Sequence, residues 1–309
     1  MSQREESKGF VIDQMEELVS SYISLQGNIG AGKSVLLDAI DAWLARNRMD
    51  GTVDYDGEIP VVRIGEVDHY FVTVREPVGL WTKECYLTEE GEPISFLKLF
   101  YGDMAKYATR FQVKAFTSRL NLVVEAVRRI RQRPNARVHL LAERSMRTDM
   151  LFFQNLGESG IVPPLEWQID WPLYKDFFDM ICTQVLRKEN IMVALNTAPD
   201  KCHARLHGRD RKDETETGVS IDYLSSLEKK HSEMLDAFRA DGKRVIELDF
   251  NRDMSRAEID EVADRLMRQL MLIAPAPPDR KRKAESIAVK ESNKRSKNVE
   301  LLPKMVEPI

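Results

Sequence analysis

The chain has 309 residues, 43% of them hydrophobic, which is enough for one large globular core and marginal for two domains. Residues 279–297 carry a net charge of +5 in a chain of −4, and the remaining −9 speaks against a folded body that binds nucleic-acid phosphates. Charged residues interrupt every apolar run before the roughly 20 residues of a membrane span, so we expect a soluble protein that does not enter a membrane.

Five β-rich runs are spaced along the chain, with helix-like segments between them. Strands are expected at 22–26, 70–74, 138–142, 191–195 and 244–248. Helices are expected at 33–46, at 96–133 with a break at Gly102, at 171–188, after Pro199, at 221–240 and at 257–273. Because strands that alternate with helices form parallel sheets, the pattern predicts an α/β fold with a five-stranded parallel sheet flanked by helices.

Three segments lie outside this alternation. Residues 1–21 are expected to form an N-terminal extension before a domain that spans 22–273. Residues 46–72 are longer than a connection between the first two strands requires, so we interpret them as an insertion at the sheet edge. Residues 274–309 are rich in proline and charge, which predicts a disordered basic tail.

A phosphate-binding loop is predicted between the first strand and the first helix. The run Gly27-Asn28-Ile29-Gly30-Ala31-Gly32-Lys33-Ser34 matches the pattern G-x-x-x-x-G-K-[ST] in full. Its glycines let backbone N–H groups turn inward, and the helix N-terminus adds positive potential for phosphate oxygens. Lys33 is expected to reach the β- and γ-phosphates of ATP, and Ser34 to bind Mg²⁺. The alternative is a glycine turn before an ordinary helix.

The loop alone does not distinguish a kinase from a GTPase or a mechanical ATPase. The Asn-Lys-x-Asp motif that binds guanine does not occur, although Asp54-Tyr-Asp-Gly57 gives a chance Asp-x-x-Gly. Two further motifs follow predicted strands, namely Arg75-Glu76-Pro77-Val78-Gly79-Leu80-Trp81 and Glu143-Arg144-Ser145. Both are therefore expected at the carboxyl ends of strands, where open α/β sheets bind their ligands.

Together these motifs resemble the deoxynucleoside kinase family, in its deoxycytidine, deoxyguanosine and deoxyadenosine kinase branch. The resemblance covers about residues 22–254, and its other motifs are Phe111-Gln112 with Arg119, Asp149, 155–160 before Glu166-Trp167, Tyr223-Leu224 and 248–251. It implies a P-loop kinase fold with a short arginine-rich lid at about 205–217. It also implies ATP-dependent phosphorylation of the 5′-hydroxyl of deoxyribonucleosides, giving monophosphates for nucleotide salvage.

The resemblance implies roles for the residues nearest the transferred phosphoryl group. Glu76 corresponds to the general base beside the sugar 5′-hydroxyl, Arg144 faces the reacting phosphoryl group, and Glu143 lies where the family places a carboxylate near Mg²⁺. A carboxylate suits the first position because it can orient a poorly nucleophilic hydroxyl and take its proton. The alternatives are a solvated loop carboxylate for Glu76 and a surface ion pair for Glu143 and Arg144.

Further residues are expected on the ATP side of the site. The lid arginines would clamp phosphate oxygens where the transition state carries charge, and they are Arg205, Arg209 and Arg211. A solvated charged loop is the alternative for each of them. Residues 251–254, with Asp253 among them, are expected to border the adenine through backbone groups.

The nucleoside pocket is expected to be lined from several elements. Tyr101 and Glu216 match the family positions that hold the 3′-hydroxyl, with Glu214 as a competitor for the second position. The aromatic residues that correspond to pocket positions are Trp81, Phe111 and Phe153. Phe153 is expected to stack on the base, and ordinary core packing is the alternative for all three.

The base preference is predicted from four residues. The Gln112 amide offers a donor and an acceptor, so it does not decide between bases. An ionised Asp149 only accepts, which suits the N–H groups of cytosine and adenine and opposes O4 of thymine. Arg119 is expected to pair with Asp149 and fill the space of the thymine methyl group, beside Ala115. We therefore predict deoxycytidine and purine deoxynucleosides ahead of thymidine, and deoxyguanosine behind deoxyadenosine because its O6 is an acceptor.

Two other functions stay open at this stage. A nucleoside monophosphate kinase of the thymidylate kinase type would share the loop and the lid, but it needs basic residues for an acceptor phosphate where Glu76 lies. A nuclear interaction protein with a degenerate kinase fold is suggested only by the basic tail.

The expected location is cytoplasmic or nuclear, not mitochondrial or secreted. Five acidic residues in the first twenty fit neither a secretory signal nor a mitochondrial presequence. The three cysteines, Cys85, Cys182 and Cys202, have no metal-ligand spacing, which predicts a reducing compartment and no zinc site. Basic clusters at 280–283 and 294–297 resemble a bipartite signal for a nuclear import receptor, with a merely solubilising tail as the alternative. The family resemblance implies a homodimer.

Overall fold

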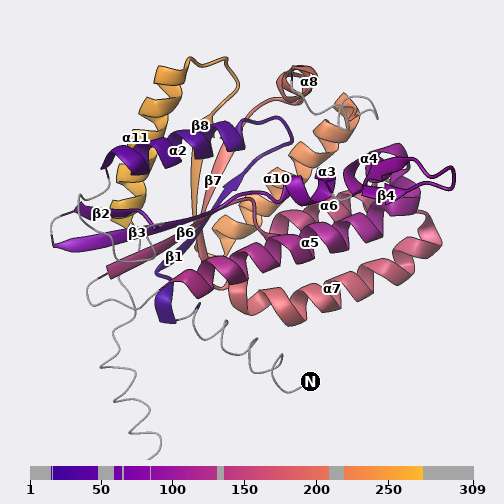
Figure 1. Cartoon of the computed structure of the whole chain (residues 1–309), viewed down its shortest axis with the longest axis horizontal. Coiled ribbons are helices and arrows are strands. Elements are labelled where there is room, and N and C mark those ends of the chain that lie inside the picture. Colours follow the sequence, from indigo (N-terminus) through magenta and orange to yellow (C-terminus); the bar gives the residue numbers. More distant parts are fainter. Residues whose placement is uncertain are drawn as a thin grey trace, which may run out of the picture.

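The computed structural model describes residues 15, 17–47, 59–64, 66–83, 85–130, 136–208 and 219–273. A six-stranded sheet runs through its centre in the order β2-β3-β6-β1-β7-β8 (Figure 1). The strands are β1 (Ser21–Gln26), β2 (Val61–Ile64), β3 (Val67–Val74), β6 (Ala136–Glu143), β7 (Glu189–Asn196) and β8 (Arg244–Asp249). The five predicted strands pair in parallel, and β2 runs antiparallel to β3.

Strand β2 corrects the prediction of five strands. It lies within the segment 46–72 that the sequence predicts as an edge insertion, and it adds one edge strand of four residues. Val61 and Val62 are buried, whereas Arg63 and Ile64 are exposed, so the strand is too short for an alternating pattern to stand out. An ion pair between Arg63 and Asp68 joins β2 to β3.

Helices cover both faces of the sheet. They are α2 (Lys33–Asn47), α3 (Val78–Lys83), α4 (Phe96–Gly102), α5 (Met104–Arg129), α6 (Met146–Glu158), α7 (Pro164–Leu186), α8 (Pro199–His207), α10 (Ile221–Ala240) and α11 (Arg256–Ile273). Figure 1 shows α2 and α11 on one face, and α5, α6, α7 and α10 on the other. A hairpin of β4 (Cys85–Leu87) and β5 (Pro93–Ser95) lies against α4. None of the helices described is long and apolar enough to cross a membrane.

The helices follow the predicted ranges with three differences, of which the first is α3, where the sequence predicts no helix. The predicted break at Gly102 is present, because α4 ends there and the Asp103 side chain caps α5 by accepting from the Lys106 N–H. Helix α6 fills residues 146–158, for which the sequence predicts no helix. Helix α7 begins at Pro164, earlier than the expected 171, and Pro172 lies inside it. At the start of the helix, Pro164 is tolerated because the N–H that proline lacks would have no helical partner in the first turn.

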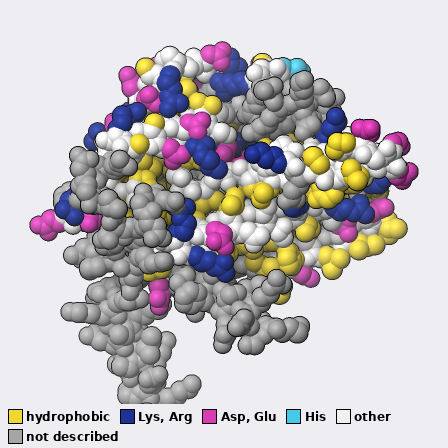
Figure 2. Space-filling view, in the orientation of Figure 1, with side chains coloured by type: hydrophobic (Ala, Val, Ile, Leu, Met, Phe, Trp, Pro, Cys, Tyr) yellow, Lys and Arg dark blue, Asp and Glu magenta, His cyan; other side chains and the backbone are white. Residues whose placement is uncertain are grey.

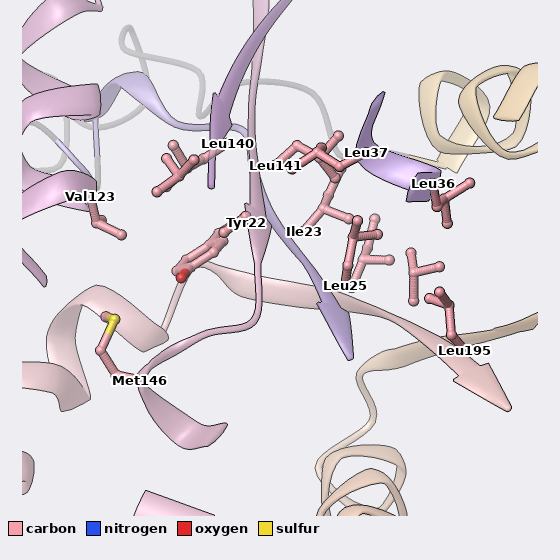
Figure 3. Close-up of a cluster of buried hydrophobic side chains, with 14 of the residues drawn as sticks. Tyr22, Ile23, Leu25, Leu36, Leu37, Val123, Leu140, Leu141, Met146 and Leu195 are labelled. Carbon is pink, nitrogen blue, oxygen red and sulfur yellow. The ribbon is translucent and has the colours of Figure 1, made fainter. Parts of the chain in front are cut away.

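Strand β1 is buried along its whole length and forms the centre of the core (Figure 3). Its side chains alternate between the two faces of the sheet. Tyr22 points toward Met146 on α6, whereas Ile23 and Leu25 lie on the side of Leu36 on α2. Burial on both faces is typical of a central strand in a parallel sheet.

The strand order brings three carboxyl ends together. Strand β6 lies between β3 and β1. The residues that follow Val74 and Gln26 therefore meet the last residue of β6, Glu143, at one edge of the sheet. This is the edge at which open parallel sheets place their ligands.

Candidate functional site

The loop between β1 and α2 is wrapped around its own lysine. Gly30 has a φ of +84°, and a Cβ there would lie 2.6 Å from the carbonyl oxygen of Cys202, so the position requires glycine. Lys33 opens α2 and donates from Nζ to the carbonyl oxygens of Gly27 at 3.1 Å and Asn28 at 2.7 Å. Residues 27–34 thus combine a glycine turn, a helix N-terminus and a buried ammonium group, which is an arrangement suited to anions.

Ser34 and Glu143 face each other at the end of the sheet. Ser34 Oγ donates to Glu143 Oε1 at 2.6 Å, which joins α2 to the end of β6. A hydroxyl and a carboxylate are hard oxygen ligands, so the pair fits Mg²⁺, which one or two protein oxygens commonly hold together with phosphate and water. Within the described ranges, no group of three or more His, Cys, Asp or Glu side chains is placed to hold a metal ion.

Glu76, two residues after β3, lies between two arginines. Its Oε1 accepts from Arg144 Nη1 at 2.7 Å and from Arg119 Nη2 at 3.0 Å. Burial raises the pKa of this carboxyl group, but the positive charges of Arg144, Arg119 and Lys33 outweigh burial and hold the pKa of Glu76 far below its ordinary value. Glu76 is therefore ionised, and an ionised carboxylate only accepts hydrogen bonds.

Arg144 has a strained backbone conformation. Its φ of +65° is the only positive value among the described non-glycine residues, and such a conformation costs on the order of 1–3 kcal/mol. Its N–H donates to the Leu25 carbonyl on β1 at 2.9 Å. Its guanidinium carbon lies 5.0 Å from the centre of the Phe152 ring. Arg144 Nε is buried with no partner in the described chain, so the side chain keeps a donor for a ligand.

A cavity adjoins these groups and contains most of the residues predicted for the substrates. The predicted residues that line it are Ile29, Gly30, Lys33, Ser34, Glu76, Trp81, Tyr101, Phe111, Gln112, Ala115, Glu143, Arg144 and Asp149. Part of its lining is aromatic, because Phe111 stacks on Phe100 at 4.4 Å and Trp81 packs edge-on against Phe111 at 5.4 Å, measured between ring centres. The Trp81 N–H donates to Ser118 Oγ at 3.1 Å, which fixes the indole ring. Such a lining suits a flat ring as ligand.

Gln112 and Asp149 supply polar groups to the same cavity. Asp149 is paired with Arg119, whose Nε and Nη2 donate to its two carboxylate oxygens at 2.9 and 3.2 Å. Burial raises the pKa of Asp149, and the charge of Arg119 opposes this rise. Arg119 is wholly buried and does not line the cavity. The expectation that Arg119 itself borders the base is thus corrected, because Ala115 and Asp149 line the cavity and Arg119 does not.

The structure places Phe153 in the core, contrary to the expectation that it stacks on the base. Phe153 is fully buried and packs against Trp167 and Tyr174, with ring centres 5.4 and 4.9 Å away. Its neighbour Phe152 lines the cavity instead. Adjacent residues on a helix point about 100° apart, so the two phenylalanines cannot be told apart until the phase of α6 is known.

On the ATP side, the structure describes Arg205 and Asp253. Arg205 Nη2 donates to the carbonyl oxygens of Phe250 at 2.9 Å and Arg252 at 3.0 Å. Its guanidinium thereby holds the segment after β8. The side chain that was expected to clamp phosphate is bonded to backbone carbonyl groups in this structure. Asp253 is exposed and pairs with Lys201. Outside the described residues lie Arg209, Arg211, Glu214, Glu216 and the basic clusters of the tail.

Four cavity residues lie outside every motif, and they are Leu97, Phe100, Thr148 and Phe152, whereas Val78 lies inside the motif at 75–81 without a predicted role. Leu97 lies four residues before Tyr101 on α4, so helical periodicity from Tyr101 is the signal that could have found it, and Phe100 follows three residues after Leu97. Thr148 and Phe152 lie on α6 with Asp149. Once α6 is known, the same periodicity groups Phe152 with Asp149.

Comparison with known proteins finds a match to the family model "Deoxynucleoside kinase" over residues 62–272. Deoxycytidine kinase 2 of Gallus gallus is 27% identical over 263 residues, which cover 77% of this chain and 85% of that protein. Deoxycytidine kinase of Mus musculus is 26% identical over 224 residues, which cover 69% and 74%. The solved structure of deoxyadenosine kinase from M. mycoides with bound dATP has a similar fold, with a TM-score of 0.53, 17% identity, and coverage of 80% of this chain and 98% of that one.

Proposed function

The chain belongs to the deoxynucleoside kinase family, and from this premise we propose how its site transfers the γ-phosphoryl group of ATP to the 5′-hydroxyl of a deoxyribonucleoside. The observation that carries the proposal is the ionised carboxylate of Glu76, held by Arg144 and Arg119 in a cavity that Lys33 also lines. A carboxylate beside an anion-binding loop suits a neutral hydroxyl acceptor and repels an acceptor that already carries a phosphate.

Glu76 acts as the general base. It orients the 5′-hydroxyl and takes its proton while the oxygen bonds to the γ-phosphorus, the bond to the β-phosphate oxygen breaks, and ADP leaves. In the free enzyme, three cations hold the pKa of Glu76 low. The negative phosphates of ATP offset the charges of Lys33 and Arg144, so the pKa of Glu76 rises on ATP binding. The carboxylate then accepts a proton more readily.

The cations around the loop stabilise the transferred phosphoryl group. Lys33 exchanges its bonds to the loop carbonyls for the β- and γ-phosphates, and Arg144 offers its Nε donor to the moving group. Mg²⁺, when bound with ATP, neutralises phosphate charge, and Ser34 and Glu143 are the residues that would hold it. The lid arginines, including Arg205, complete the clamp.

The cavity prefers deoxycytidine and deoxyadenosine to deoxyguanosine, and all three to thymidine. Ionised Asp149 accepts from the exocyclic N–H groups of cytosine or adenine, whereas thymine O4 and guanine O6 are acceptors that face it. Gln112 serves any base through its donor and acceptor. Ala115 and Asp149 leave little room for the thymine methyl group. Tyr101, with Glu216, holds the 3′-hydroxyl, and the ring lies between Phe152 and the aromatic residues Trp81 and Phe111.

The enzyme forms a homodimer through helix α7. An apolar stripe on this helix is 54–71% exposed and consists of Leu165, Ile169, Leu173 and Met180. The first three are four residues apart and therefore share one helix face. Figure 2 shows hydrophobic side chains gathered along the edge that α7 occupies in Figure 1. An exposed stripe of this kind marks an interaction surface, and the family resemblance supplies a second copy of this chain as its occupant.

The monophosphates enter nucleotide salvage for DNA synthesis. The enzyme resides in the cytoplasm or the nucleus, and a nuclear import receptor binds the tail. The support is the pair of basic clusters at 280–283 and 294–297, which are separated by ten residues.

A radiolabelled-ATP assay over the four deoxynucleosides and their monophosphates tests this function. Labelled deoxycytidine and deoxyadenosine monophosphates are expected as the main products, with less from deoxyguanosine and least from thymidine. Label transferred to the monophosphates in preference to the nucleosides would contradict the role given to Glu76.

A further inference from the structure

A buried hydrogen-bond chain runs from the Arg144–Ser145 peptide into the sheet. The Ser145 N–H donates to Thr148 Oγ1 at 3.4 Å, and Thr148 Oγ1 donates to Gln26 Oε1 at 2.7 Å. Gln26 Nε2 donates to Ser24 Oγ at 3.0 Å, and Ser24 Oγ donates to Glu189 Oε1 at 2.6 Å. Each of the five residues is at most 1% exposed, so the chain is shielded from water throughout.

The carboxylate at the end of this chain sets the direction of every bond. Glu189 Oε2 accepts from Arg147 Nε at 2.8 Å, so both carboxylate oxygens act as acceptors. Ser24 must therefore donate to Glu189, and its oxygen then accepts from the Gln26 NH₂ group. This orientation turns the Gln26 carbonyl toward Thr148, and the carbonyl oxygen accepts a hydrogen bond from the Thr148 hydroxyl. Bonds that all point one way polarise and strengthen one another in a low-dielectric interior.

Both peptide groups that flank Arg144 are thereby attached to β1. The Arg144 N–H reaches the Leu25 carbonyl directly at 2.9 Å, and the Ser145 N–H reaches Gln26 through Thr148. A non-glycine residue at a φ of +65° persists only where its surroundings determine its conformation. These two attachments to β1 fix the backbone conformation of Arg144.

We propose that Gln26 and Ser24 are positioning residues for the reaction, because the hydrogen-bond chain to Glu189 holds Arg144 in the left-handed turn that presents its guanidinium to the transferred phosphoryl group. This inference rests on the role proposed above for Arg144. It adds that the polarity of a buried chain inside the sheet governs the geometry of that arginine.

Ser24→Ala tests the chain, and Ser21→Ala is its matched control. Both serines lie on β1 and are fully buried, and Ser21 makes its bond to His139 Nδ1 at 2.8 Å outside the chain. Ser24→Ala leaves Gln26 and Glu189 each without one partner. The kcat of Ser24→Ala should fall about five- to tenfold while KM for both substrates stays within about twofold. Deuterium exchange of the Ser145 amide should accelerate by a similar factor, whereas Ser21→Ala changes neither quantity.

Gln26→Met, which keeps the side-chain length, should reproduce both effects, and thermal unfolding of all variants separates them from a general loss of stability. Equal kcat in Ser24→Ala and Ser21→Ala, or unchanged Ser145 exchange in Ser24→Ala, overturns the inference. Arg144→Lys is measured alongside. Full kcat in that variant contradicts the proposed role of Arg144, whereas a Ser145 amide that does not respond to Ser24→Ala contradicts the hydrogen-bond chain alone.

Discussion

Arg119 and Asp149 form a two-point ion pair in the protein interior, with Nε to Oδ2 at 2.9 Å and Nη2 to Oδ1 at 3.2 Å. The same Nη2 also reaches Glu76 Oε1 at 3.0 Å. One guanidinium therefore connects the carboxylate proposed to read the base with the carboxylate proposed to accept the 5′ proton. A substitution at Arg119 should change both the rate and the preference, so preference is measured as a ratio of kcat/KM values.

Arg119→Met combined with Asp149→Ala should favour thymidine. The double variant removes the acceptor that faces thymine O4 and makes room for the methyl group. The ratio of kcat/KM for thymidine to that for deoxycytidine should rise about 5- to 150-fold, the effect of a buried mismatch of about 1–3 kcal/mol. Steady-state kinetics with the two nucleosides measure this ratio.

A control for this double substitution lies on the exposed side of α5, the helix that carries Arg119. Glu125→Ala with Arg128→Met removes a surface ion pair of α5 and should leave the ratio unchanged. Thymidine turnover by the unmodified enzyme that equals or exceeds deoxycytidine turnover would remove Asp149 from base recognition.

The base preference should also depend on pH. Burial raises the pKa of Asp149, so this group takes up a proton at a higher pH than an exposed aspartate does. Protonation turns an acceptor into a donor, which favours thymine O4 and disfavours the cytosine N–H group. The thymidine to deoxycytidine ratio should therefore rise as the pH falls through the pKa of Asp149, whereas protonation of Glu76 slows both reactions alike and cancels in the ratio. In Asp149→Asn the ratio should not change with pH, and an equal slope in both enzymes would refute this assignment.

The α7 stripe should control the oligomeric state. Leu165→Glu with Leu173→Glu places two charges on the proposed dimer surface and should convert a dimer into a monomer in sedimentation experiments. Leu272→Glu on α11 is the control, because Leu272 is also an exposed leucine but lies off the stripe. A native protein that sediments as a monomer, or a dimer that survives the double substitution, would argue against this interface.

The basic tail should act in localisation and not in catalysis. A chain that ends after Ala274 lacks both basic clusters. It should keep its full kinase activity and fail to accumulate in the nucleus of a eukaryotic cell when it carries a fluorescent tag. Nuclear enrichment of the truncated protein would defeat the import signal.

The candidate site could be predicted where its residues lie in motifs at strand ends. The residues Glu76 and Arg144 follow the parallel strands β3 and β6, and strand order alone brings such ends to one edge of the sheet. Phe152 could not be separated from Phe153 because the sequence gives no phase for an unpredicted helix. Strand β2 could not be predicted because its two buried residues are too few to show the alternating pattern of a strand. The hydrogen-bond chain from Thr148 to Glu189 matches no sequence motif, because its members come from α6, β1 and β7 and only tertiary packing joins them.

Glu76→Gln, measured in single-turnover experiments with deoxycytidine, tests most directly whether this carboxylate carries the phosphorylation. The amide keeps the shape of the side chain but is a much weaker base. The rate of the chemical step should therefore fall by roughly 10² to 10⁴ while equilibrium binding of ATP stays nearly unchanged. Glu158→Gln, an exposed carboxylate near the end of α6, should leave both quantities as they are. An unchanged rate of phosphoryl transfer in Glu76→Gln would contradict the proposed mechanism.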